Sequence, residues 1–90
     1  MVLVKISSIE LGSEGLYIAK LRITYGGRSY EINIEKLLRK PFRAKARLEG
    51  NYILVNIEDN EGKPLSSCCI HVEHLEKGCM DCKSLLIPPL

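Results

Sequence analysis

Apolar and polar residues alternate along most of this chain. In residues 16–25 every second position is apolar, and the positions between them carry Lys20, Arg22 and Thr24. Residues 42–49 repeat the alternation with basic residues on the polar positions. A strand turns successive side chains to opposite faces, so each stretch predicts a strand with one buried face and one face in water.

Tight turn signals separate these stretches. Gly26-Gly27 and Gly50-Asn51 each stand between two alternating runs, which is typical of two-residue hairpin turns. Residues 35–40 are good helix formers and precede Pro41, so we expect one short helical turn there. The expected strands are residues 2–11, 16–25, 28–34, 42–49, 52–58 and 65–75. The pattern predicts an all-β fold, a small antiparallel β-barrel or sandwich of about six strands with one short helical turn.

A chain of 90 residues is enough for one domain with one core. We expect residues 1–84 to form a single β domain and residues 85–90 to form an apolar C-terminal tail. No apolar run approaches the roughly 20 residues of a membrane span, and the first residues lack the pattern of a signal peptide. The sequence therefore predicts a cytoplasmic protein that does not bind a membrane.

All four cysteines and both histidines lie in residues 68–82. Thiolates and imidazoles are preferred zinc ligands, and the two-residue gap of a Cys-x-x-Cys turn lets both sulfurs reach one ion. In an extended segment Cys69 and His71 share the outward face, whereas Cys68 shares the core face with Ile70. We expect a zinc site made of Cys69, His71, Cys79 and Cys82. If the segment turns helical, His74 becomes an alternative ligand.

Disulfides are the alternative use of these cysteines. The chain has no Gln and no Trp and is rich in Lys, Arg, Glu, Ile and Leu, a composition that leans toward a thermophile. Intracellular proteins of hyperthermophiles do carry disulfides. Bridges among Cys68, Cys69, Cys79 and Cys82, with no cofactor bound, therefore remain open, as do reduced thiols.

Basic residues concentrate in one short stretch of the chain. They are Lys36, Arg39, Lys40, Arg43, Lys45 and Arg47. The last three alternate along one expected strand, so their charges share a face at intervals of about 7 Å. Lys20, Arg22 and Arg28 would extend the patch if their strands lie beside it, and Tyr25, Tyr30 and Tyr52 are candidate stacking surfaces.

We expect a small non-enzymatic module that binds DNA or RNA through this basic strand face. No nucleophile stands beside an evident base and orienting group, which argues against an enzyme. The alternative is a protein-interaction or assembly module that docks on itself or on another protein. It would use an exposed strand edge or the apolar tail.

Overall fold

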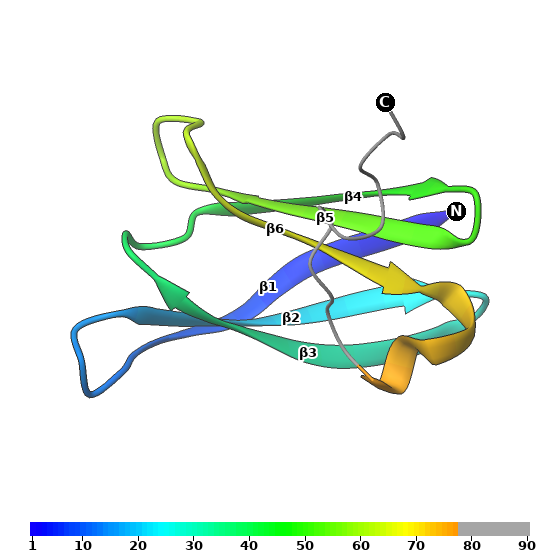
Figure 1. Cartoon of the computed structure of the whole chain (residues 1–90), viewed down its shortest axis with the longest axis horizontal. Coiled ribbons are helices and arrows are strands. Elements are labelled where there is room, and N and C mark those ends of the chain that lie inside the picture. The colour runs from blue at the N-terminus through cyan, green and yellow to red at the C-terminus, as the bar shows by residue number, and fades with distance from the viewer. Residues whose placement is uncertain (78–90) are drawn as a thin grey trace, which may run out of the picture.

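Two three-stranded β-sheets lie one above the other in the computed structural model, which describes residues 1–77 (Figure 1). Sheet A consists of β1 (Val2–Leu11), β2 (Tyr17–Tyr25) and β3 (Arg28–Leu37). Sheet B consists of β4 (Arg43–Glu49), β5 (Tyr52–Glu58) and β6 (Pro64–His71), and a 3-10 helix, η1 (Val72–Lys77), follows β6. The all-β prediction is confirmed, in the form of two layers.

Each sheet pairs its strands in chain order, and all four pairings are antiparallel. The β2–β3 hairpin closes on the pair Tyr25–Arg28, and the two glycines between them have φ of 61° and 78°. Residues other than Gly, Asn and Asp rarely adopt such positive φ angles, which is why Gly26-Gly27 makes this turn. The predicted turn at Gly50-Asn51 is confirmed as well, between Glu49 and Tyr52.

The hydrophobic core lies between the two sheets. Alternate residues of β2 and β3 from sheet A meet alternate residues of β5 and β6 from sheet B. The largest fully buried side chains include Leu21, Ile23, Ile53, Ile57 and Ile70. β1 packs against β4 at one side of the two layers. Leu75 of η1 joins the same core cluster.

The helical turn expected at residues 35–40 is absent. β3 instead continues to Leu37, which pairs with Tyr17 of β2 and is buried against the core. Burial of Leu37 on the strand face outweighs the helical propensity of its neighbours, because propensity is a weak preference. The last expected strand also ends early, at His71, where the chain turns into η1.

The chain carries an irregular pairing where β3 leaves the ladder. Ala19 pairs with Ile34 and Tyr17 with Leu37, so Glu35 and Lys36 together lie opposite Ile18. This is a β-bulge, and within it Lys36 has a φ of 61°. A left-handed backbone strains a residue with a Cβ, so the bulge holds Lys36 in an unfavourable conformation.

We expect Lys36→Gly to raise the free energy of unfolding by up to about 1 kcal/mol, because glycine relieves this strain. Urea unfolding monitored by circular dichroism would measure the change. The matched control is Glu35→Gly, one residue earlier and outside the positive-φ region, which should destabilise the protein by about 0.5–1 kcal/mol. Destabilisation by both substitutions would mean that the bulge is unstrained.

η1 is the sole helix in residues 1–77, and no helix in that part of the chain is long and apolar enough to cross a membrane. The predicted boundary at residue 84 and the tail at residues 85–90 lie outside the described residues.

Candidate nucleic-acid interface

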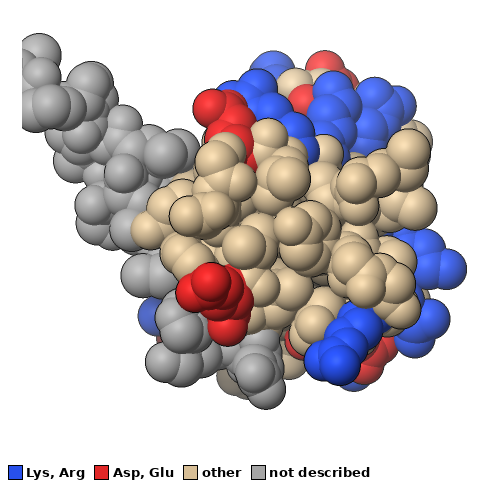
Figure 2. All heavy atoms as spheres, turned by 90° about the vertical axis from the view of Figure 1, so that its right-hand side faces the viewer, with Lys and Arg blue, Asp and Glu red and all other residues tan. Residues whose placement is uncertain are grey.

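The outward face of β4 carries three basic side chains in a row. Arg43, Lys45 and Arg47 are exposed, whereas Ala44 and Ala46 between them pack against the core. This separation follows from the strict alternation along β4, which pairs with β5 without a register shift. Consecutive charges on one strand face are about 7 Å apart. Figure 2 shows basic side chains gathered at the top of the molecule, on the side of sheet B, with acidic ones among them.

Two of these three cations form ion pairs. Lys45 Nζ lies 3.4 Å from Glu58 Oε2, and Arg47 Nη2 lies 2.7 Å from Glu49 Oε2. The four side chains are all at least partly exposed, and such surface pairs contribute only about 0–1 kcal/mol. A phosphate group can therefore replace either carboxylate at little cost, although both acids lower the net positive charge of the face.

Neighbouring strands add neutral polar groups to the same face. Lys45 stands opposite Asn56 of β5, which in turn pairs with Ser67 of β6. Lys45, Arg47, Leu54 and Asn56 line a shallow hollow of about 270 Å³. Cationic and amide side chains are the groups that commonly contact phosphates and sugars. This part of sheet B therefore has the chemistry of a surface that contacts a sugar-phosphate backbone.

Arg39 is held by a buried carboxylate. Its Nε donates to Asp59 Oδ2 at 2.9 Å, and the backbone amides of Glu61 and Lys63 both donate to Asp59 Oδ1 at 2.9 Å. Asp59 is only 5% exposed. The interaction ties the β3–β4 connection to the β5–β6 loop, so Arg39 has a structural task that the sequence did not reveal.

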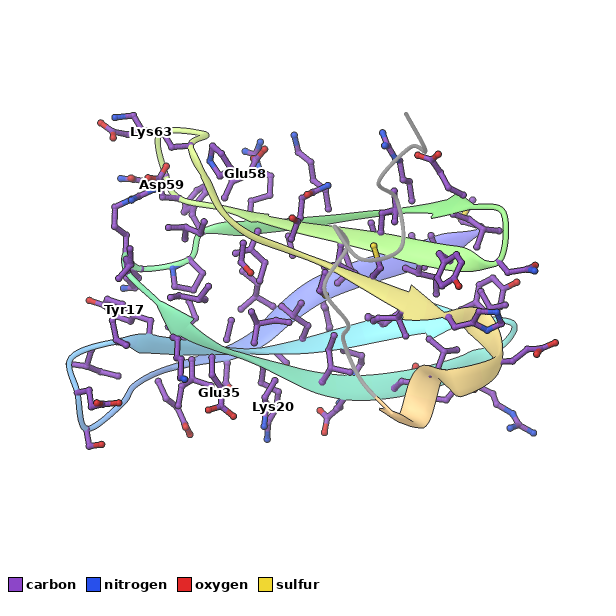
Figure 3. All side chains as sticks on the ribbon, in the orientation of Figure 1. Tyr17, Lys20, Glu35, Glu58, Asp59 and Lys63 are labelled. Carbon is purple, nitrogen blue, oxygen red and sulfur yellow. The ribbon has the colours of Figure 1, made fainter. Side chains whose placement is uncertain are left out.

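The electrostatics of Asp59 follow from these contacts. Burial on its own would raise the pKa of the carboxyl group, because it disfavours the charged form. The hydrogen bonds from the Lys63 and Glu61 amides and from Arg39, together with the charge of Arg39, outweigh burial and lower the pKa below its usual 3.8. The ionised carboxylate is thus part of the folded state. Figure 3 shows Asp59 beside Lys63 at one end of sheet B.

Phe42 is the functional candidate that sequence reasoning missed. Alternation predicted that its side chain would share the core face with Ala44, but it is 60% exposed. Its ring lies next to the Arg43 guanidinium, whose central carbon is 5.8 Å from the ring centroid. The signal that could have found it is Pro41, which cannot donate to a ladder and so places Phe42 at the very start of the strand, where alternation is a weak guide to burial.

The structure divides the six predicted basic residues into three groups. Arg43, Lys45 and Arg47 share the outward face of sheet B, and Arg39 and Lys40 line a hollow beside Phe42 at the start of β4. Lys36 instead lines a separate hollow with Gly12 and Glu14 of the β1–β2 turn. We use the term basic face for Arg39, Lys40, Arg43, Lys45 and Arg47.

The idea that Lys20 and Arg22 extend this patch is wrong. Both lie on the outward face of sheet A, where Lys20 pairs with Asn33 and Arg22 forms an ion pair with Glu31 at 3.4 Å. Lys20 and Glu35 point away from sheet B in Figure 3, whereas Glu58 projects from the opposite side of the molecule. The two sheets separate these charges because each turns its polar face outward.

The tyrosines expected to stack on bases are engaged elsewhere. Tyr25 and Tyr30 pack against the core as partly buried residues. Tyr52 lies on the outward face of sheet B but meets His71 edge to face, with ring centroids 5.0 Å apart. Phe42 is therefore a better candidate for base stacking than any of the three.

The predicted zinc site lies partly outside the described residues, because these end before Cys79 and Cys82. Cys68 faces the core, as expected, and Cys69 and His71 lie on the other face of β6, opposite Leu54 and Tyr52. Cys69 is nevertheless fully buried there, which the alternation did not predict. Cys68 and Cys69 are both disulfide-bonded in the structure. Within residues 1–77 no cluster of three or more metal-ligating side chains occurs. A sulfur in a disulfide is not a thiolate ligand, so the bonded state of Cys69 agrees with the disulfide alternative. The four-residue zinc site, two of whose residues are not described, stays a prediction.

The comparisons with known proteins give no match: no family model, no curated protein and no solved structure is significantly similar to this chain.

Proposed function

We propose that this protein is a small, non-enzymatic, cytoplasmic module that binds DNA or RNA through its basic face. The observation that carries the proposal is the row Arg43, Lys45 and Arg47, three exposed cations on one face of a regular strand. Their spacing of about 7 Å is in the range of successive phosphates along an extended nucleic-acid strand. Phosphate contacts of this kind supply most non-specific affinity for nucleic acids.

The position of the row supports this reading. β4 is an outer strand of sheet B and pairs only with β5 in the described part of the chain. β1 packs against its other side, so a ligand reaches the outward side chains of β4 from above the sheet. Lys40 adds a positive charge before the start of the strand, whereas the charge of Arg39 is balanced by Asp59. A polymer that follows β4 would therefore meet the three cations in succession before it reaches Glu49 at the end of the strand.

Fluorescence anisotropy of labelled oligonucleotides tests the proposal. With three to five phosphates contacted, the slope of log K against log salt should be roughly −2 to −3.5 for a single-stranded probe between about 50 and 200 mM salt. For a duplex probe it should be roughly −2.7 to −4.5. No binding at the lowest salt concentration, or binding that does not change with salt, would reject nucleic acid as the ligand.

The competing proposal is assembly with another protein or with itself through a strand edge or the tail at residues 85–90. It predicts self-association or partner binding that persists when the oligonucleotide affinity is zero. Sedimentation of the same samples distinguishes the two proposals.

A further inference from the structure

A hollow of about 360 Å³ lies between the β3–β4 connection and the β5–β6 loop. The connection contributes Arg39, Lys40, Pro41 and Phe42 to its walls, and the loop contributes Asp59 and Glu61. Its volume falls within the range of small-ligand sites, which are mostly apolar with a few fixed polar groups. Arg39 and Lys40 of the basic face are therefore part of its walls.

The ring of Phe42 is the main apolar group of this hollow. The backbone amide of Phe42 donates to the Glu58 carbonyl at 2.8 Å, so the residue is anchored at the start of β4 while its side chain stays outside the core. An aromatic ring this exposed loses the stabilisation that burial would give it. The ring therefore offers free apolar area to a planar ligand.

The walls of the hollow are fixed before any ligand arrives. Asp59 holds Arg39 on one side and the amides of Glu61 and Lys63 on the other, as described above. Pro41 restricts the backbone immediately before Phe42. A preformed site avoids the entropic penalty of ordering its own loops on binding.

The surroundings of the hollow are neutral on one side, where ion pairs balance the charges, and positive on the other. Asp59 is neutralised by Arg39 at 2.9 Å, and Glu61 lies 3.7 Å from Lys63 Nζ. Lys40 and Arg43 flank Phe42 along the chain. The exposed part of the Phe42 ring offers an apolar surface to a neutral ring system, and Lys40 and Arg43, whose guanidinium lies over the same ring, offer positive charge to its phosphates.

We propose that this hollow takes an unpaired base of a single-stranded nucleic acid, stacked on Phe42, with its neighbouring phosphates on Lys40 and Arg43. The inference rests on the proposed function and adds to it the preference for single strands. A base within a duplex is stacked on both faces and cannot reach the ring. Stacking on an exposed aromatic residue is the usual source of affinity for single strands.

The chain has a single phenylalanine, so its ring can be observed without ambiguity. Protein labelled with 4-fluorophenylalanine should give one fluorine resonance, which reports only residue 42. Titration with oligothymidylate should shift this resonance strongly, and titration with a duplex, which reaches Arg43 beside the ring but cannot stack on it, should shift it much less. A resonance that does not move while oligothymidylate is bound would overturn the stacking inference and leave the basic face as the binding surface.

Substitution provides the second readout. Phe42→Ala should weaken binding of oligothymidylate by roughly 5- to 150-fold, since stacking is worth about 1–3 kcal/mol per base, and should leave duplex affinity and the salt slope unchanged. Phe42→Tyr should retain the affinity. The matched control is Leu38→Ala, which removes an exposed apolar side chain from the same connection and should have no effect on binding.

The outcomes separate the two proposals. Equal losses in Phe42→Ala and Leu38→Ala, or no loss in Phe42→Ala, would overturn the stacking inference while salt-dependent binding upholds the proposed function. Failure of the unmodified protein to bind either probe would overturn both.

Discussion

Replacing Arg43 and Arg47 together by glutamate should reduce oligonucleotide affinity on the order of 100-fold at about 50 mM salt. Each substitution removes a phosphate contact and introduces a repulsive charge, and together they leave Lys45 between two acids. The salt slope should also become less negative by about 1.4 for a single-stranded probe, because two fewer counterion-releasing contacts remain. Anisotropy titrations at several salt concentrations measure both quantities.

The matched control is the double reversal of Lys5 and Lys20 to glutamate. Both lysines lie on the outward face of sheet A, and each reversal changes the charge by two, so both double variants take the formal net charge from +2 to −2. Only the variant in sheet B should lose most of its affinity. Equal losses of oligonucleotide affinity in the two variants would contradict binding at the basic face and would mean that net charge alone determines the affinity. Loss of folding is checked by thermal unfolding of each variant.

Replacing Asp59 by asparagine should lower Tm at neutral pH on the order of 5 °C or more. Asparagine keeps one acceptor oxygen for the Glu61 and Lys63 amides but removes the charge and places an NH₂ group against the Arg39 guanidinium. A buried donor without an acceptor is more costly than a lost surface contact. Thermal unfolding followed by circular dichroism measures the change.

The pH dependence gives this prediction a second test. The folded-state pKa of Asp59 lies below the usual 3.8, so the ionised carboxylate stabilises the fold above pH 3.8 and its contribution is lost as the pH falls through the lower folded value. The Tm difference between the unmodified protein and Asp59→Asn should therefore shrink as the pH drops below 3.8. Glu61→Gln, in the same loop but exposed, should leave the acid transition unchanged. A Tm difference that stays constant down to pH 2 would contradict the role of the Asp59 charge.

Most of the fold was predictable because its signals are local. Alternation and two-residue turns identify β2, β3, β4 and β5 to within a few residues, and the same alternation places Arg43, Lys45 and Arg47 on one face. Cys68 was correctly assigned to the core because Ile70 shares its face. Each of these predictions depends only on residues close together in the chain.

The errors came from contacts that join distant segments. Arg39 looked like a free surface cation, since its partner Asp59 is 20 residues away in the chain. Leu37 looked helical because the burial that holds it in β3 comes from Tyr17 and from the opposite sheet. The exposure of Phe42 depends on how the connection approaches sheet B, which alternation does not specify.

The pairing of strands in chain order has a consequence for how the chain folds. Every ladder in residues 1–77 joins strands that are consecutive along the chain. Each sheet is therefore a meander with short loops between its strands. Closing short loops costs little entropy, and folds rich in near-neighbour contacts fold faster than sandwiches whose strands cross between sheets. The contacts between the two sheets, such as those of β1 with β4, join residues farther apart in the chain. The five-residue connection between Leu37 and Arg43, which holds Arg39 and Phe42, is therefore the hinge on which the two halves come together.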